Sequence, residues 1–168
     1  MNLGALLSRT PDPLEERARE LLPVAQLVAL GTLELKDKLT SLEKVDETWW
    51  RFFVTVAVVF MASTRLRNLE LGRQREERLM KIAARPFQQW HPRVYQAFED
   101  CKAFYNRTYD GQEATHTGDE KRFVSSDTVG GWVTWNILER APATDEECQL
   151  VRAIGILITA PAFGAWDG

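Results

Sequence analysis

Histidine and cysteine are scarce in this sequence, with two of each among 168 residues. A protein site for a transition metal usually needs three or four converging ligands, and His and Cys are the commonest of them. The sequence also contains no H-E-x-x-H, C-x-x-C or G-x-S-x-G motif and no glycine-rich phosphate-binding loop. We therefore expect no metal site and no cofactor, and no motif marks the chain as an enzyme.

We expect no secretory signal either. Residues 1–10 contain an apolar stretch of only a few residues before Arg9 and Pro11, which is shorter than a signal peptide requires. The sequence therefore predicts a cytoplasmic protein. Because thiols stay reduced in that compartment, Cys101 and Cys148 are expected to be free core or boundary residues rather than a disulfide.

The sequence has no apolar run of the length that crosses a membrane. Its main apolar run, from Trp49 to Ala62, already contains Arg51, whereas a spanning helix needs about 20 mostly apolar residues. A run of this size is typical of a buried core helix, and we do not expect the membrane to be a partner. The net charge of -3 gives no global argument for nucleic acid either.

The sequence does contain strong helical periodicity. Apolar residues recur in steps of three and four from Leu14 to Leu39, and Trp49, Phe53 and Val56 begin a second such stripe. The second stripe has apolar residues on its other sides too, which is typical of a helix buried all round. We therefore predict a single all-α domain over residues 1–168, an irregular bundle of five to seven helices around a central apolar helix at about 43–66.

Proline, glycine and capping residues predict where these helices end. Thr40–Glu43 and Thr144–Glu147 have the form of capping boxes that open helices. Pro86 predicts a helix end with a linker at 85–92. Residues 108–126 are polar and aperiodic and predict a loop, and 161–168 predict an irregular C-terminal tail. The periodicity leaves open whether the first two segments form one long helix or a hairpin, and we favour the hairpin.

The polar segment 108–126 contains residue types that enzymes use for catalysis. His116, with Asp119 and Asp127, has the residue types of a general base and its orienting carboxylate, or of part of a hydrolytic metal site. Gly130 and Gly131 could offer backbone donors to an anion or allow close helix packing. An enzyme or small-ligand binder that uses this segment is therefore one alternative function.

The arginine-rich segment 65–85 carries a second alternative. It holds seven basic and three acidic residues inside a chain of net negative charge. Arginine suits phosphate and carboxylate well, so Arg73, Arg75 and Arg78 are candidates for binding nucleic acid or an acidic protein surface. The basic residues are spread around the helix, and its Glu residues neutralise part of their field, so nucleic acid is the weaker alternative.

Six tryptophans are many for a chain of this length. Tryptophan is enriched in the cores of interfaces. The candidates for binding a partner are Trp90, Trp132 and Trp135. Together with the absence of catalytic motifs, they favour a non-enzymatic helical binding module that acts on a protein partner or on a second copy of itself.

Overall fold

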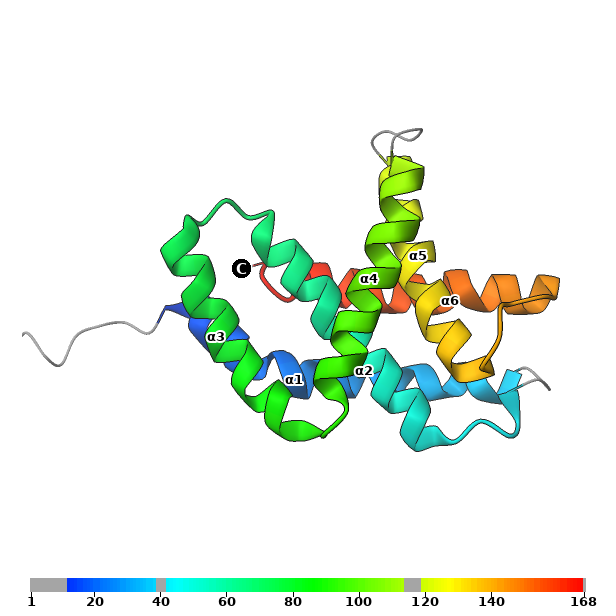
Figure 1. The fold of residues 1–168 in the computed structure, drawn as a ribbon. Coiled ribbons are helices and arrows are strands. Elements are labelled where there is room, and N and C mark those ends of the chain that lie inside the picture. The colour runs from blue at the N-terminus through cyan, green and yellow to red at the C-terminus, as the bar shows by residue number, and fades with distance from the viewer. Residues whose placement is uncertain (1–11, 39–41, 114–118, 168) are drawn as a thin grey trace, which may run out of the picture.

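The computed structural model describes residues 12–38, 42–113 and 119–167, with the backbone alone described at 113 and 119–123. Within these residues the chain forms six α-helices and no strand, which confirms the predicted all-α fold (Figure 1). A 3-10 helix, η2, follows the first helix. The helices are α1 (Pro13–Gly31), η2 (Thr32–Lys38), α2 (Glu47–Arg67), α3 (Arg73–Trp90), α4 (Val94–Glu113), α5 (Asp119–Leu138) and α6 (Asp145–Gly164).

Helix α2 is the centre of the fold, as predicted, and it is buried on nearly every side. From Val54 to Ala62 every residue is at most 5% exposed. Helices α1, α4, α5 and α6 all pack on it, so α1 and α2 form the predicted hairpin. The helix begins four residues later than expected because Asp46, rather than the Thr40–Glu43 segment, caps it, accepting a hydrogen bond from the Thr48 N–H at 2.7 Å. None of the described helices has the length and hydropathy of a membrane span.

Three tryptophan side chains attach neighbouring elements to one another through buried or partly buried hydrogen bonds. The indole N–H of Trp50 donates to Thr32 Oγ1 at 2.9 Å, and that of Trp132 donates to Asp100 Oδ2 at 3.2 Å. The indole N–H of Trp166 donates to the carbonyl oxygen of Ala62 at 2.7 Å. Since an unpaired buried N–H would cost about 1–3 kcal/mol, these bonds allow the large rings to lie in the core.

The predicted irregular tail at 161–168 is wrong over residues 161–164. Helix α6 continues through Pro161 to Gly164, and Trp166 is 4% exposed. Proline removes the hydrogen bond to the carbonyl of Leu157, but Leu157 is 42% exposed, so water can replace that bond. Burial of the Trp166 ring against α2 then outweighs the local tendency of proline to end the helix.

The predicted linker at 85–92 is wrong over residues 85–90, and the physical reason is the same. Helix α3 passes through Pro86 and ends at Trp90. Two aromatic side chains beyond the proline hold this last part in place. Phe87 is 5% exposed, and the Trp90 ring stacks on Phe52 of α2 with 5.6 Å between centroids.

The predicted polar loop at 108–126 is also wrong over most of its length. Helix α4 continues to Glu113 and α5 begins at Asp119, so the two helices stand side by side and project from the rest of the fold (Figure 1). Two small polar residues of this segment lie between helices instead of in solvent. Ser125 and Ser126 are buried, and the Ser125 hydroxyl lies 2.7 Å from the Tyr105 hydroxyl. The polar composition of this segment therefore led us to predict a loop where two helices pack together.

Glycine allows α5 and α6 to approach each other closely. A Cβ atom added at Gly130 would clash with the carbonyl oxygen of Val151, and one added at Gly155 would clash with the carbonyl oxygen of Ser126. Gly131 has open space around its Cβ position. Gly130 and Gly131 lie in the middle of α5, so helix packing accounts for Gly130, and neither residue lies at a helix start.

The predicted capping box opens α6. The Glu147 N–H donates to Thr144 Oγ1 at 3.1 Å, and Glu147 Oε2 accepts from the backbone N–H of Thr144 and of Ala143. Arg140 adds two charge-assisted bonds to the same carboxylate, at 2.6 and 3.0 Å. The hydrogen bond from Arg140, followed by that from Ala143, lowers the pKa of Glu147 from 4.5 to about 2.

We expect Gly130→Ala and Gly155→Ala to lower the free energy of unfolding by about 3 kcal/mol, because the added methyl group must separate two packed backbones. Gly131→Ala is the matched control, and it should raise the free energy of unfolding by up to about 1 kcal/mol, since alanine favours the helix interior. Urea unfolding measures all three changes. Equal tolerance of alanine at Gly130 and Gly131 would show that the two helices are not in close contact.

Acid should weaken the fold through Glu147. Its carboxyl binds a proton less tightly in the folded than in the unfolded state, so its contribution to stability is complete above about pH 4.5 and is lost as the pH falls towards about 2. Glu147→Gln should therefore flatten the loss of stability in this range, as followed by urea unfolding. Glu146→Gln, a change at the exposed neighbouring carboxylate, should leave the acid sensitivity intact. Parallel pH profiles for the wild type and Glu147→Gln would contradict this assignment.

Candidate functional site

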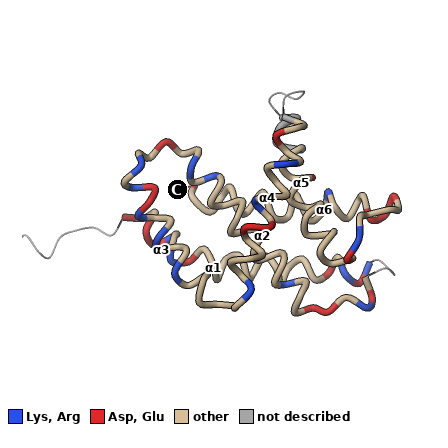
Figure 2. The backbone as a smooth tube through the Cα atoms, in the orientation of Figure 1, with Lys and Arg blue, Asp and Glu red and all other residues tan. Residues whose placement is uncertain are grey.

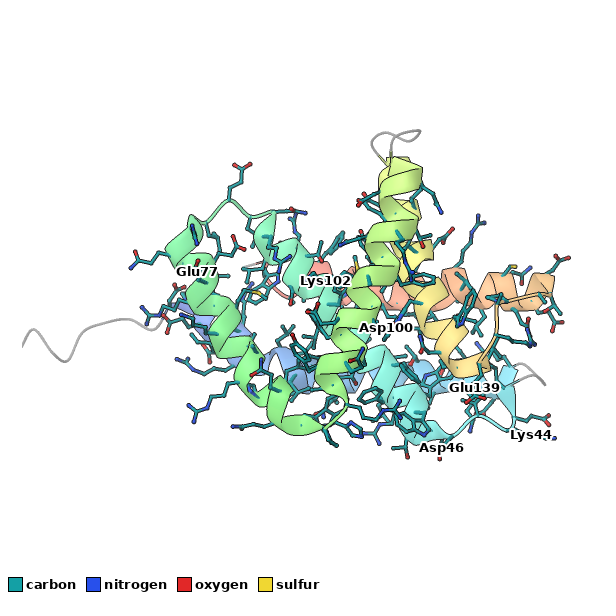
Figure 3. All side chains as sticks on the ribbon, viewed as in Figure 1. Lys44, Asp46, Glu77, Asp100, Lys102 and Glu139 are labelled. Carbon is teal, nitrogen blue, oxygen red and sulfur yellow. The ribbon has the colours of Figure 1, made fainter. Side chains whose placement is uncertain are left out.

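An open groove of about 760 Å³ lies between the start of α2 and the end of α5. We call it the tryptophan groove. Its lining consists of residues 44–46, Trp49, Phe53, Arg93 and residues 135–140. Figure 3 shows Lys44, Asp46 and Glu139 from these segments at the same end of the molecule.

Two large aromatic side chains on different helices are exposed in this groove. Trp49 of α2 is 36% exposed and Trp135 of α5 is 49% exposed. The Arg93 guanidinium lies 4.9 Å from the centroid of the Trp49 ring, a cation–π contact. The Trp135 ring meets Phe104 edge-on at 6.4 Å. Both rings are thus held by a neighbour and still present apolar surface to solvent.

The base of the groove is connected to the core. Phe53 lines the groove, and its ring packs edge-on against the buried Trp132 at 5.7 Å. Trp132 is 1% exposed. The groove is therefore built on rigid, packed side chains, which lowers the entropy that a bound partner would have to remove.

Some charged side chains of the groove already form hydrogen bonds or ion pairs within the protein, and others do not. Asp46 caps α2, and the hydrogen bonds from Thr48, the backbone bond first, lower its pKa. Arg140 is bonded to Glu147. Lys44 and Arg93, in contrast, form no ion pair with any residue that the structure describes, so two positive groups remain available to an incoming anion.

Glu139 shapes the end of the groove through its backbone. Its φ of +56° lies in the left-handed region, which costs a residue with a side chain about 1–2 kcal/mol. This conformation ends α5 at Leu138 and directs the chain towards α6. A glycine would have signalled such a turn in the sequence. Because a glutamate occupies the position, the sequence did not indicate this helix end.

The arginine candidates lie on α3, where Figure 2 shows basic and acidic residues of α1 and α3 close together. Arg75 bonds Asp12 at 3.0 Å, and Arg78 pairs with Glu15 of α1 at 2.6 Å. The hydrogen bond from Arg75 is the first cause of a lowered pKa at Asp12. Arg73 pairs with Glu77 on its own helix at 2.8 Å. A partner that uses these arginines would have to compete with intramolecular carboxylates.

The three tryptophan candidates have different surroundings. Trp132 is in the core and cannot touch a partner directly, whereas Trp135 is exposed. Trp90 is half-buried at the end of α3. Trp49, Lys44 and Arg93 were not among the predicted site residues. Trp49 was assigned to the core because its neighbours are apolar, but its place in the first turn of α2, beside a polar segment, could have indicated exposure.

Of the three catalytic candidates, Asp119 and Asp127 lie among the described residues, and their backbones are not adjacent. His116 lies outside the described residues. Asp119 is the first residue of α5, and Asp127 lies eight residues further along the same helix, a rise of about 12 Å. The Asp127 carboxylate is 3.4 Å from Arg152 of α6. No group of three His, Cys, Asp or Glu side chains suited to a metal ion occurs among the described residues.

The two cysteines are free, as expected. Cys101 is fully buried, and this burial raises the pKa of its thiol well above the usual value. Cys148 is exposed on α6.

Comparisons with protein families, curated proteins and solved structures found no match to this chain. The proposed function therefore rests on the geometry of the tryptophan groove.

Proposed function

We propose that this protein is a helical binding module that holds a segment of a partner protein in the tryptophan groove. The observation that supports this proposal is the pair of exposed rings, Trp49 and Trp135, on opposite elements of one groove. Burying an exposed tryptophan ring against a partner lowers the free energy of the complex. Tryptophan also contributes much of the binding energy in many interfaces.

The charges suggest the chemistry of the partner segment. Lys44 and Arg93 have no carboxylate partner among the described residues, and the Arg93 guanidinium lies over the Trp49 ring at 4.9 Å from its centroid. A guanidinium in a cation–π contact can still donate hydrogen bonds to a carboxylate. We therefore propose a segment with an aromatic or large aliphatic side chain that enters between the two tryptophans, next to an Asp or Glu that reaches Lys44 or Arg93.

Selection from a displayed random peptide library on the immobilised protein tests this proposal. The selected peptides should combine a large apolar residue with a neighbouring Asp or Glu. Trp135→Ala should weaken their binding about 30-fold, because loss of an anchoring side chain at an interface costs about 2 kcal/mol. Titration by fluorescence or calorimetry measures the change.

The control is Tyr95→Ala, which removes another exposed aromatic ring, 67% exposed on α4 and outside the groove. Its peptide affinity should equal that of the wild type. Peptides that bind Trp135→Ala as tightly as the wild type would rule out the groove as their site. Concentration-dependent dimerisation that Trp135→Ala abolishes, seen by sedimentation, would identify a second copy of the chain as the occupant instead.

A further inference from the structure

A smaller cavity, of about 260 Å³, shares Trp49 as a lining residue with the tryptophan groove. We call it the aromatic pocket. It is formed where the end of α3 meets α2 and α1, and its lining residues are Gln26, Thr48, Trp49, Arg51, Phe52, Thr55, Trp90 and His91. This volume is below that of a typical drug-sized site, so the pocket is suited to a small molecule.

Aromatic rings form the walls of the pocket. Trp90 is stacked on Phe52 at 5.6 Å, with 29° between the ring planes. His91 lies 4.6 Å from Phe52, and Trp49 meets Phe52 edge-on at 5.4 Å. Aromatic pairs prefer such offset or edge-on contacts. A planar ring inserted here could continue the same arrangement.

Thr55 is the most buried polar side chain of the lining. It is 1% exposed, and its hydroxyl has no hydrogen-bond partner among the described residues. Four other buried hydroxyl groups within α-helices do have a partner, because each donates to the carbonyl oxygen four residues earlier. They belong to Ser63, Thr128, Thr134 and Thr159. A buried hydroxyl without a partner costs about 1–3 kcal/mol, a cost that a ligand acceptor could remove.

The lining favours an anion. It contains Arg51, which is exposed and forms no ion pair with the described part of the chain, and the lining includes no described Asp or Glu. His91 Nδ1 accepts a hydrogen bond from the Arg93 N–H at 3.1 Å. Because Nδ1 accepts, the proton of the neutral imidazole ring lies on Nε2, and Nε2 can donate a hydrogen bond to a ligand.

From these contacts we propose that the aromatic pocket binds a small planar aromatic carboxylate. The ring packs beside Phe52 and Trp90, and the carboxylate accepts hydrogen bonds from Arg51 and His91, with the Thr55 hydroxyl as a further donor. This site is separate from the tryptophan groove, although Trp49 belongs to both. It therefore does not depend on the function proposed for the groove.

Benzoate is the probe, and benzylamine and acetate are its controls. Benzoate shares its ring with benzylamine, which has the opposite charge, and its carboxylate with acetate, which has no ring. In calorimetric titration of the whole chain, benzoate should bind at least tenfold more tightly than either control. Equal binding of benzoate and benzylamine, or no benzoate binding at millimolar concentration, would overturn the proposal.

Two substitutions locate the site. Thr55→Val keeps the shape of the side chain and removes the hydroxyl, and Arg51→Gln removes the positive charge. Each should weaken benzoate binding about tenfold, as expected for the loss of one bond to a charged group. Thr55→Val should at the same time maintain or raise the melting temperature of the free protein, because it removes an unpaired buried hydroxyl. A merely structural Thr55 would leave benzoate affinity unchanged.

Two controls complete the test. Arg107→Gln removes an exposed arginine of α4 that does not line the pocket, and it should leave benzoate affinity unchanged. Trp135→Ala should also leave it unchanged, so that failure of the tryptophan groove and failure of the aromatic pocket are distinguished. Wild-type benzoate affinity in both Thr55→Val and Arg51→Gln would exclude the aromatic pocket as the site.

Discussion

The burial of α2 on nearly all sides is the constraint on which the rest of the fold depends. A helix with apolar residues around its whole circumference is stable in water only when other helices cover every face. Here α1, α4, α5 and α6 supply that cover. The tryptophans that enter this core bring indole N–H groups, and each of the three described donors, Trp50, Trp132 and Trp166, has an acceptor.

The proposed sites lie at the first turn of α2, where the cover is incomplete. Trp49 is 36% exposed there, while Trp50, the next residue, is fully buried. Trp49 lines both sites. The end of α5 adds Trp135 to the tryptophan groove, and the end of α3 adds Trp90 and His91 to the aromatic pocket. One ring at the helix end therefore serves as a wall for two sites of different size.

The sequence predicted the features that depend on local patterns. The all-round apolar character of α2 and the Thr144–Glu147 box are such patterns, and both were confirmed. The errors at Pro86 and Pro161 share a physical cause, because burial of aromatic rings beyond each proline outweighed the cost of the lost hydrogen bond. Exposure depends on tertiary packing, so the sequence alone could not distinguish the buried Trp132 from the exposed Trp135. For the same reason it could not show that Arg75 pairs with Asp12, the N-cap of α1, and Arg78 with Glu15 of α1.

The tryptophan groove is tested most directly by the six indole N–H signals in a nitrogen–proton correlation spectrum, recorded while a selected peptide is added. Each signal reports one tryptophan. The proposed function predicts that the signals of Trp49 and Trp135 move, while those of the buried Trp50, Trp132 and Trp166 stay nearly constant. Saturable peptide binding that leaves Trp49 and Trp135 unchanged would contradict the account.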